Sequence, residues 1–398
     1  MKILYLTTWF PYPPTQGSKI RAYNLLRSLS EENEIYLISF CDNPVEKQWI
    51  THLKTYCNEI VIVNRKPFDY SRFRKFLGFF SPLPSAVVAG YSREMREKVQ
   101  KIAETWKPDM AFALTFVTAP YALQIPDIFH VVDMDNLLAL MLKDLYKESK
   151  GGIEKIRRYL AYWKFKNYEN KIYRKFDLAL VCSELDKIRS RNYIQLDQNK
   201  IISIPNGVEV NHQKNHSISS TSPRIIFNGS LSYWPNFDAM NYFISEIFPL
   251  ILEEIPDCQL LITGKTDNVE KLPSINEKVV FTGFVEDINS LVSSCDACVI
   301  PLRHGAGTRL KILEAMAVGT PVITTSKGAE GLEVINDQHL LIKDNPHEFA
   351  SATIQVLRNT QLKDRLTREA RKLVETCYDW RIIGEKLNRA IKNLTIQQ

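Results

Sequence analysis

Long hydrophobic runs are missing from this chain of 398 residues. No stretch reaches the roughly 18 consecutive apolar residues of a membrane-spanning helix. The 15 glycines and 19 prolines are too few for a low-complexity or fibrous chain. The first residues, MKILYLTTWFPYPP, favour a buried strand over a signal peptide because their apolar run is short. We therefore expect a folded cytoplasmic protein, with two domains because one core rarely serves a chain of this length.

Paired cysteines are also scarce. The seven cysteines are scattered through apolar stretches, and Cys295-Asp-Ala-Cys298 is the one close pair. A zinc site would need a second pair or nearby histidines at ligand spacing. The sequence therefore predicts buried thiols in a reducing compartment and no zinc site.

Positive charge is unevenly divided. Residues 1–205 hold 31 Lys and Arg against 22 Asp and Glu, whereas residues 206–398 hold 20 against 23. A basic half favours an anionic partner, which leaves nucleic acid, anionic lipid and a phosphorylated substrate. Two runs, 65–80 and 143–175, mix basic with aromatic residues. No nucleic-acid motif accompanies them, so we expect an anionic membrane surface, at the inner face of the cell membrane, and no nucleic acid.

Short apolar runs alternate with helical patterns, which is typical of parallel sheets with crossover helices. In the first half we expect strands at 2–6, 35–40, 59–63, 110–114, 128–132 and 178–181, and helices at 18–30, 44–56 and 92–105. In the second half we expect strands at 224–227, 259–263, 278–281, 297–301 and 321–325, and helices at 236–255, 285–294, 308–318 and 379–395. The polar segment 203–222 contains Pro205, Asn206 and Gly207 and predicts the boundary between two doubly wound α/β domains.

The segment 304–325 has the strongest functional pattern. Gly305 and Gly307 lie between an expected strand and a helix from Thr308, where glycines let the backbone approach an anion and the helix N-terminus attracts it. Arg309 and Lys311 add positive charge, and Glu314 shares a helix face with Lys311. The pattern predicts a phosphate-binding site; the alternative is a solvated ion pair on a helix.

Several motifs together resemble the GT-B glycosyltransferases, especially the family-four-like enzymes that build bacterial surface polysaccharides. The motifs are Pro205-Asn-Gly-Val208, Phe227-Asn-Gly-Ser-Leu231, Leu261-Ile-Thr-Gly264, Phe281-Thr-Gly-Phe-Val285, and the set Gly307, Arg309, Lys311, Glu314-Ala-Met-Ala317, Gly319 and Pro321-Val322. The resemblance implies two Rossmann-like domains facing a cleft. Residues 1–205 would bind the acceptor, residues 206–378 the nucleotide sugar, and residues 379–398 would form a helix that returns to the first domain.

The resemblance also implies an activity. The chain would move a sugar from a nucleoside diphosphate sugar to a hydroxyl of a lipid-linked glycan, retaining the anomeric configuration, with no metal or other cofactor. Glu314 would bind the ribose, and the main chain of Gly264, Phe284 and Val285 the base. The remaining donor-site residues would be Gly229, Ser230, Gly305, Gly307, Thr308 and Leu310, and the loop with Gly17 and Arg21 would approach the phosphates or the acceptor.

Two positions depart from the family pattern. Many relatives carry an acidic residue eight positions before the helix glutamate, where this chain has Ala306. Many also carry Arg and Lys shortly after the glycine corresponding to Gly229, where this chain has Ser-Leu-Ser-Tyr-Trp. We therefore hypothesise that Arg309 and Lys311 hold the diphosphate instead.

Asp133 and Asp135 follow an expected strand at the edge where open α/β sheets bind ligands. We expect one of them to position the acceptor hydroxyl. The triplet Asp133-Met-Asp135 also matches the metal-binding motif of the GT-A glycosyltransferases. Such a triplet often arises by chance, however, and the motifs of the second half favour GT-B, so we do not expect a shared metal.

Three other classes remain open. A sugar-nucleotide epimerase of the same fold would use the same donor site, and a non-catalytic nucleotide- or glycan-binding relative would bind without turnover. A dinucleotide-dependent oxidoreductase would need Gly-x-Gly-x-x-Gly after its first strand, a pattern that neither half has.

Overall fold

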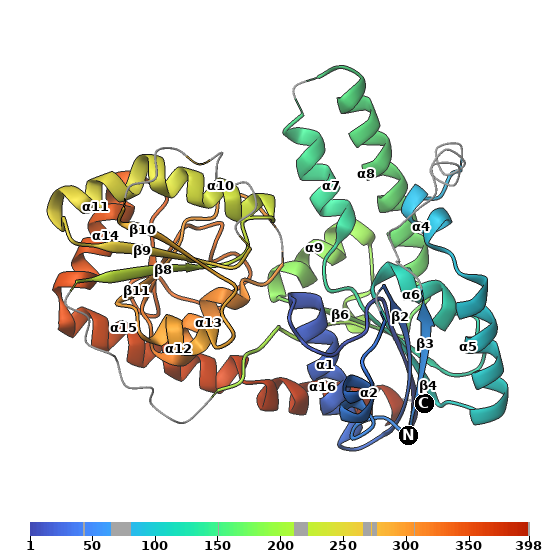
Figure 1. The fold of residues 1–398 in the computed structure, drawn as a ribbon. Coiled ribbons are helices and arrows are strands. Elements are labelled where there is room, and N and C mark those ends of the chain that lie inside the picture. Colours follow the sequence, from blue (N-terminus) through green and yellow to red (C-terminus); the bar gives the residue numbers. More distant parts are fainter. Residues whose placement is uncertain are drawn as a thin grey trace. The chain divides into compact units, whose positions relative to one another are not determined.

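The computed structural model describes residues 1–42, 44–64, 81–149, 151–210, 222–265, 272, 277–305 and 307–396. The chain divides into two compact units, Met1–Pro205 with Ile383–Gln398 and Asn206–Ile382 (Figure 1). The basic and aromatic run 65–80, part of the polar boundary segment and Ala306 lie outside the described residues. Within the described ranges, no helix has both the length and the hydrophobicity to cross a bilayer.

The first unit is built on a parallel sheet with strand order β3-β2-β1-β4-β5-β6-β7. Its strands are β1 (Lys2–Thr7), β2 (Glu34–Cys41), β3 (Glu59–Asn64), β4 (Met110–Leu114), β5 (Phe129–Asp133), β6 (Leu178–Val181) and β7 (Ile201–Ser203). Every residue of β4 is buried, as expected where helices cover both faces of a parallel sheet. The direction in which successive strands are added reverses between β1 and β4, and ligands bind open α/β sheets at such a point.

Helices connect these strands. They are α1 (Gly17–Ser30), α2 (Lys47–Leu53), α4 (Ser85–Gly90), α5 (Arg93–Trp106), α6 (Thr115–Ala122), α7 (Leu138–Lys147), α8 (Gly152–Tyr173) and α9 (Glu184–Ile194). The last helix, α16 (Trp380–Ile396), packs against α1: Asn388 Nδ2 donates to the Ser28 carbonyl at 2.9 Å. A Cβ at Gly384 would lie 2.4 Å from Ser28 Oγ, so this contact requires glycine.

The second unit has a parallel sheet with order β10-β9-β8-β11-β12-β13. Its strands are β8 (Arg224–Asn228), β9 (Gln259–Thr263), β10 (Val279–Gly283), β11 (Ala297–Ile300), β12 (Val322–Thr324) and β13 (Leu341–Ile342). Its helices are α10 (Trp234–Tyr242), α11 (Phe248–Glu254), α12 (Ile288–Ser293), α13 (Leu310–Val318), α14 (Pro346–Arg358) and α15 (Thr360–Leu373). Here the direction of strand addition reverses between β8 and β11.

Two expected helices differ from the structure. The helix expected at 236–255 is divided into α10 and α11 by a π-helical turn, Phe243–Ile247, which precedes a proline in the first turn of α11. The helix expected from Thr308 begins at Leu310, because Arg309 has φ −84° and ψ 75° and is not helical. The short strands β7 and β13 were not predicted, since two or three residues give no periodicity to detect.

Candidate functional site

The carboxyl ends of β8 and β11 bring two glycine-containing loops together in the second unit. Gly229 and Ser230 follow β8, and the segment 301–309 follows β11. The two strands are neighbours in the sheet, and the direction of strand addition reverses between them. This edge is therefore where a doubly wound sheet offers a ligand site.

Lys311 reaches across from α13 to the loop after β8. Its Nζ donates to Asn236 Oδ1 at 2.9 Å and lies 4.1 Å from the centre of the Phe227 ring. A Cβ at Gly229 would lie 2.6 Å from this Nζ, so glycine is what lets the ammonium group approach the loop. Burial, together with a smaller effect of the Arg309 charge, lowers the pKa of Lys311 to about 7. A bound anion would favour the charged form again.

Arg309 is the N-cap residue of α13 and is 7% exposed. Its Nη2 lies 3.2 Å from the position that a Cβ would take at Gly305. Gly305 and Gly307 have φ of +106° and +83°, backbone conformations that glycine adopts without strain. The Arg309 side chain makes no cap hydrogen bond. The first N–H groups of α13, Arg309 and Lys311 all lie at the N-terminal end of this helix. This combination suits an anionic ligand.

Glu314 lies one turn further along α13. Its Oε2 accepts a hydrogen bond from Asn228 Nδ2 at 3.1 Å, at the end of β8. Burial raises the pKa of Glu314, and Lys311 acts in the opposite direction. A carboxylate fixed at this edge can accept hydrogen bonds from a diol such as a ribose.

The other predicted donor residues lie at the same edge. Gly264 follows β9 with φ +94°, and a Cβ there would lie 2.8 Å from the Ser230 backbone nitrogen. Phe284, which is 83% exposed, and the partly buried Val285 follow β10. Leu310 donates its N–H to the Thr308 carbonyl at 3.1 Å in the turn that leads into α13. The structure thus gathers the predicted donor residues on one edge of one sheet.

In the first unit, Gly17 opens α1 as an exposed residue, but Arg21 is only 1% exposed. Its Nε and Nη2 donate to the two oxygens of Asp133 at 2.8 and 2.7 Å, and its Nη1 donates to the Ile204 carbonyl at 2.9 Å. Burial alone would lower the pKa of Arg21, but the Asp133 carboxylate raises it above its ordinary value. Both side chains are occupied in a buried ion pair. We therefore reassign them from the expected phosphate and acceptor contacts to a structural role.

Asp135 differs from Asp133 in its surroundings. Strand β5 ends at Asp133, and Asp135 lies beyond the strand with φ +46°. Asp135 accepts from Ser18 Oγ at 2.8 Å and lines a small pocket that Asp133 also borders. Burial raises the pKa of Asp135, as does Asp133, whereas Arg21 lowers it. Asp135 is thus the carboxylate that can meet a ligand here.

Four residues of these sites were not predicted. Asn236 holds Lys311, Asn228 holds Glu314, and the hydroxyls of Thr8 and Thr115 share a hydrogen bond of 2.8 Å where β1 and β4 end. Thr115 has φ +67°, which is rare for a β-branched residue. For Thr8, Thr115 and Asn228 the available signal was a polar residue at or just beyond the end of an apolar strand, whereas Asn236 lies within α10.

Two doubly wound α/β units, with Arg309 and Lys311 at the strand-end edge of the second, define the fold class of the chain. The solved sucrose-phosphate synthase from Thermosynechococcus elongatus has this fold, with a TM-score of 0.75 at 16% identity over 100% of both chains. Anabaena Alr3699/HepE, solved in complex with UDP and glucose, gives a TM-score of 0.65 at 16% identity over 99% of this chain and 100% of its own.

Sequence comparisons relate part of the chain to one family. Residues 222–359 match the model of the family described as glycosyl transferases group 1. A Klebsiella pneumoniae protein, described as an uncharacterized 44.6 kDa protein in the cps region, is 23% identical over 95% of this chain and 96% of its own length. The chain thus has the GT-B fold, and its residues 222–359 are similar to the group 1 glycosyl transferases, in agreement with the resemblance that its motifs predicted.

Proposed function

We propose that the chain transfers a sugar from a nucleoside diphosphate sugar to a hydroxyl of a lipid-linked glycan during the synthesis of a surface polysaccharide. The part of this proposal that concerns the sugar donor rests on the position of Lys311. Its ammonium group contacts the Gly229 loop beside the N-terminus of α13. The HepE complex with UDP and glucose supports such a donor, and the relative in the cps region supports the pathway.

The chemistry follows from charge. Breaking the bond between the sugar and the diphosphate leaves negative charge on the departing phosphates. Lys311, Arg309 and the first N–H groups of α13 would stabilise that charge. Asp135, beside Ser18, would accept the hydrogen bond of the attacking hydroxyl. By resemblance to the family, the anomeric configuration is retained.

This mechanism uses no metal. Both oxygens of Asp133 accept hydrogen bonds from Arg21, so the Asp133-Met-Asp135 triplet would have to break that ion pair to offer a second carboxylate to a cation. Loss of the pair would leave Arg21 charged and buried, which is costly.

The transfer is tested by incubating the protein with a panel of nucleoside diphosphate sugars and polyprenyl-diphosphate-linked sugars. We expect release of nucleoside diphosphate that depends on the acceptor and continues in EDTA, with the product anomer read by NMR. An isomerised sugar nucleotide without diphosphate release would identify an epimerase. Donor binding without either product would identify a binding protein, and loss of turnover in EDTA would refute the metal-free mechanism.

A membrane surface is the second part of the proposal. Apolar residues on α8 recur at helical spacing and are solvent-exposed: Ile153 (87%), Ile156 (62%), Leu160 (37%) and Trp163 (46%). Helices α7 and α8 together hold eight Lys and Arg against three Asp and Glu. They are tied by Glu169, whose carboxylate accepts from the backbone N–H groups of Leu138 and Ala139. An exposed apolar row among basic residues suits an anionic lipid surface.

Replacing Ile153 and Ile156 together by glutamate should lower binding to anionic liposomes more than about tenfold. The reason is that each isoleucine side chain buried in the lipid surface contributes about 1.5 kcal/mol or more to binding. Flotation with phosphatidylglycerol vesicles measures the effect. The matched control is Ile188→Glu on α9, a residue that is 56% exposed outside the row. Equal flotation of the double variant and the control would contradict the assignment.

A further inference from the structure

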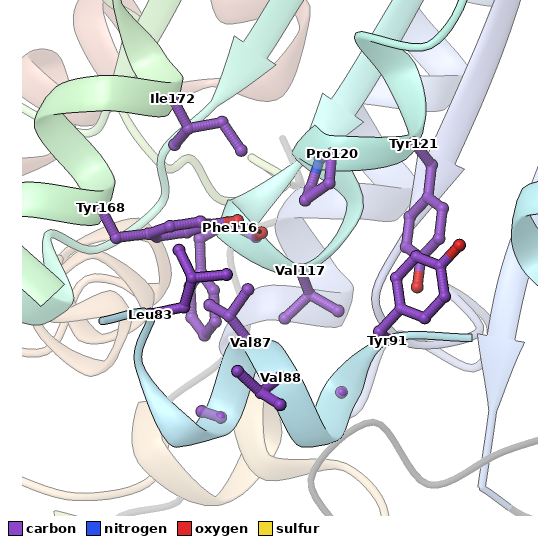
Figure 2. A pocket seen from close by; sticks show the side chains of 12 residues that line it. Leu83, Val87, Val88, Tyr91, Phe116, Val117, Pro120, Tyr121, Tyr168 and Ile172 are labelled. Atoms are coloured by element: carbon purple, nitrogen blue, oxygen red, sulfur yellow. Dashed lines mark hydrogen bonds between the residues drawn. The ribbon is translucent and has the colours of Figure 1, made fainter. Parts of the chain in front are cut away.

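An apolar cavity of about 450 Å³ lies between α4, α6 and α8 in the first unit. Leu83 and Val87 line it on one side, Phe116 and Val117 from α6 on another, and Tyr168 and Ile172 from α8 on a third (Figure 2). The volume falls within the range of about 300–1,000 Å³ that small-molecule pockets occupy. It is separate from the edge of the second unit's sheet where the donor residues lie.

The hydroxyls of Tyr121 and Tyr168 in its walls are already bonded to the backbone. Tyr121 Oη accepts from the Ser92 N–H at 2.7 Å, and Tyr168 Oη donates to the Phe116 carbonyl at 3.3 Å. The ring of Tyr91, 43% exposed at the rim, stacks on Tyr121 with a centroid distance of 6.0 Å. A ligand that fills this cavity therefore gains apolar contact rather than hydrogen bonds, as in dry apolar cavities that take up hydrocarbons.

The cavity directly adjoins the polar end of the sheet. Helix α6 begins at Thr115, whose hydroxyl is bonded to Thr8 in the pocket that Asp135 lines. The next two residues of the helix, Phe116 and Val117, line the apolar cavity. One turn of α6 thus separates a site for a hydroxylated group from a site for a hydrocarbon.

Helix α8 gives a second observation. Its N-terminal half carries the exposed row of Ile153, Ile156, Leu160 and Trp163, and its C-terminal half supplies Tyr168 and Ile172 to the cavity. The same helix therefore presents apolar side chains to the outside and to the cavity. A molecule with a sugar and phosphate head and a hydrocarbon tail matches a polar pocket followed by an apolar cavity and an exposed apolar row.

We propose that the cavity binds the hydrocarbon chain of the lipid-linked acceptor while the acceptor sugar lies at Thr8, Thr115 and Asp135. This assignment rests on the proposed transfer for the identity of the lipid. Chain binding itself can be measured without any donor.

The test uses cis-parinaric acid, a fluorescent 18-carbon fatty acid, with dodecyl phosphate as competitor. We expect the intact protein to bind one equivalent of the probe and to release it to dodecyl phosphate. Ala86→Phe fills the cavity, and Leu83→Glu places a charge at its rim, where Leu83 is 41% exposed. Each should weaken probe binding about tenfold or more. Ile188→Glu, a substitution on α9 outside the cavity, should bind as the unchanged protein does.

Two readouts separate this proposal from the donor chemistry. Thermal unfolding with and without UDP-glucose reports folding and donor binding of each variant, and both should match the unchanged protein. Absence of probe binding, or equal binding by all variants, overturns the cavity assignment even if sugar transfer is found. Saturable binding lost in both cavity variants supports it even if transfer is not found.

Discussion

Replacing Lys311 by methionine should lower kcat for nucleoside diphosphate release about 10²- to 10³-fold, the usual effect of removing one preorganised charge-stabilising donor. The reason is the position of Lys311, whose Nζ is held by Asn236 at the Gly229 loop. The residues that directly follow Gly229, Ser-Leu-Ser-Tyr-Trp, include no basic side chain that could replace it. Methionine keeps the length of the side chain and removes its charge. Steady-state kinetics with saturating donor and acceptor give the measurement.

The fold should survive this change. A lysine whose pKa is lowered by burial from 10.5 to about 7 costs free energy of folding at every pH below 10.5, and most below pH 7. Methionine should therefore leave the free energy of unfolding unchanged or slightly higher. The matched control is Lys363→Met, since Lys363 pairs with Asp296 at 3.0 Å just before the amino end of β11. Turnover close to normal in Lys311→Met would remove Lys311 from the mechanism.

Binding at different pH gives an independent readout. At pH 8 most Lys311 side chains are neutral in the unliganded protein, because their pKa is about 7. A bound diphosphate raises that pKa, so binding should take up a proton at pH 8 and little at pH 6. Calorimetry in buffers of different ionisation enthalpy counts the protons. Lys311→Met should lose this uptake, and uptake unchanged in the variant would point to another group.

The sequence predicted the edge of the second sheet because its signals are local. Apolar strands, the glycines at 305 and 307 and the three-residue spacing of Lys311 and Glu314 all lie within short windows. The partners of these residues could not be predicted in the same way. Asn236 is 75 residues from Lys311, and Asn228 is 86 residues from Glu314, so each contact depends on how the strands are ordered in the sheet.

The first unit shows more clearly which features cannot be predicted from the sequence. Arg21 and Asp133 are 112 residues apart. Asp133 resembles a ligand-binding residue because it ends a strand, and Arg21 because it lies in the helix that follows the first strand and its loop. Only their burial, 1% and 0% exposed, distinguishes a structural ion pair from a ligand contact. Asp135 was predicted at this edge of the sheet, but nothing local to the sequence predicts its φ of +46° beyond the end of β5.

Replacing Arg21 by methionine should lower the free energy of unfolding by about 3–5 kcal/mol, because Asp133 would be left fully buried without its partner cation. For a unit of this size the loss corresponds to a Tm lower by about 6–20 °C. The guanidinium also donates to the carbonyl of Ile204, so the change loosens the end of β7 as well as β5. Thermal unfolding measures the shift. Arg27→Met, on the same helix, is the control and should change Tm little.

A double variant separates stability from function at this pair. Arg21→Met with Asp133→Leu removes both charges, and apolar side chains in place of a buried ion pair are often neutral for stability. Two charged groups act on the pKa of Asp135 in the unchanged protein: Asp133 raises it and Arg21 lowers it. The double variant removes both groups. If the pair serves only the fold, the double variant should regain both Tm and turnover. If the pair also sets the charge of Asp135, Tm returns while the pH profile of turnover stays displaced. Recovery of neither would show that the pair is needed in some other way.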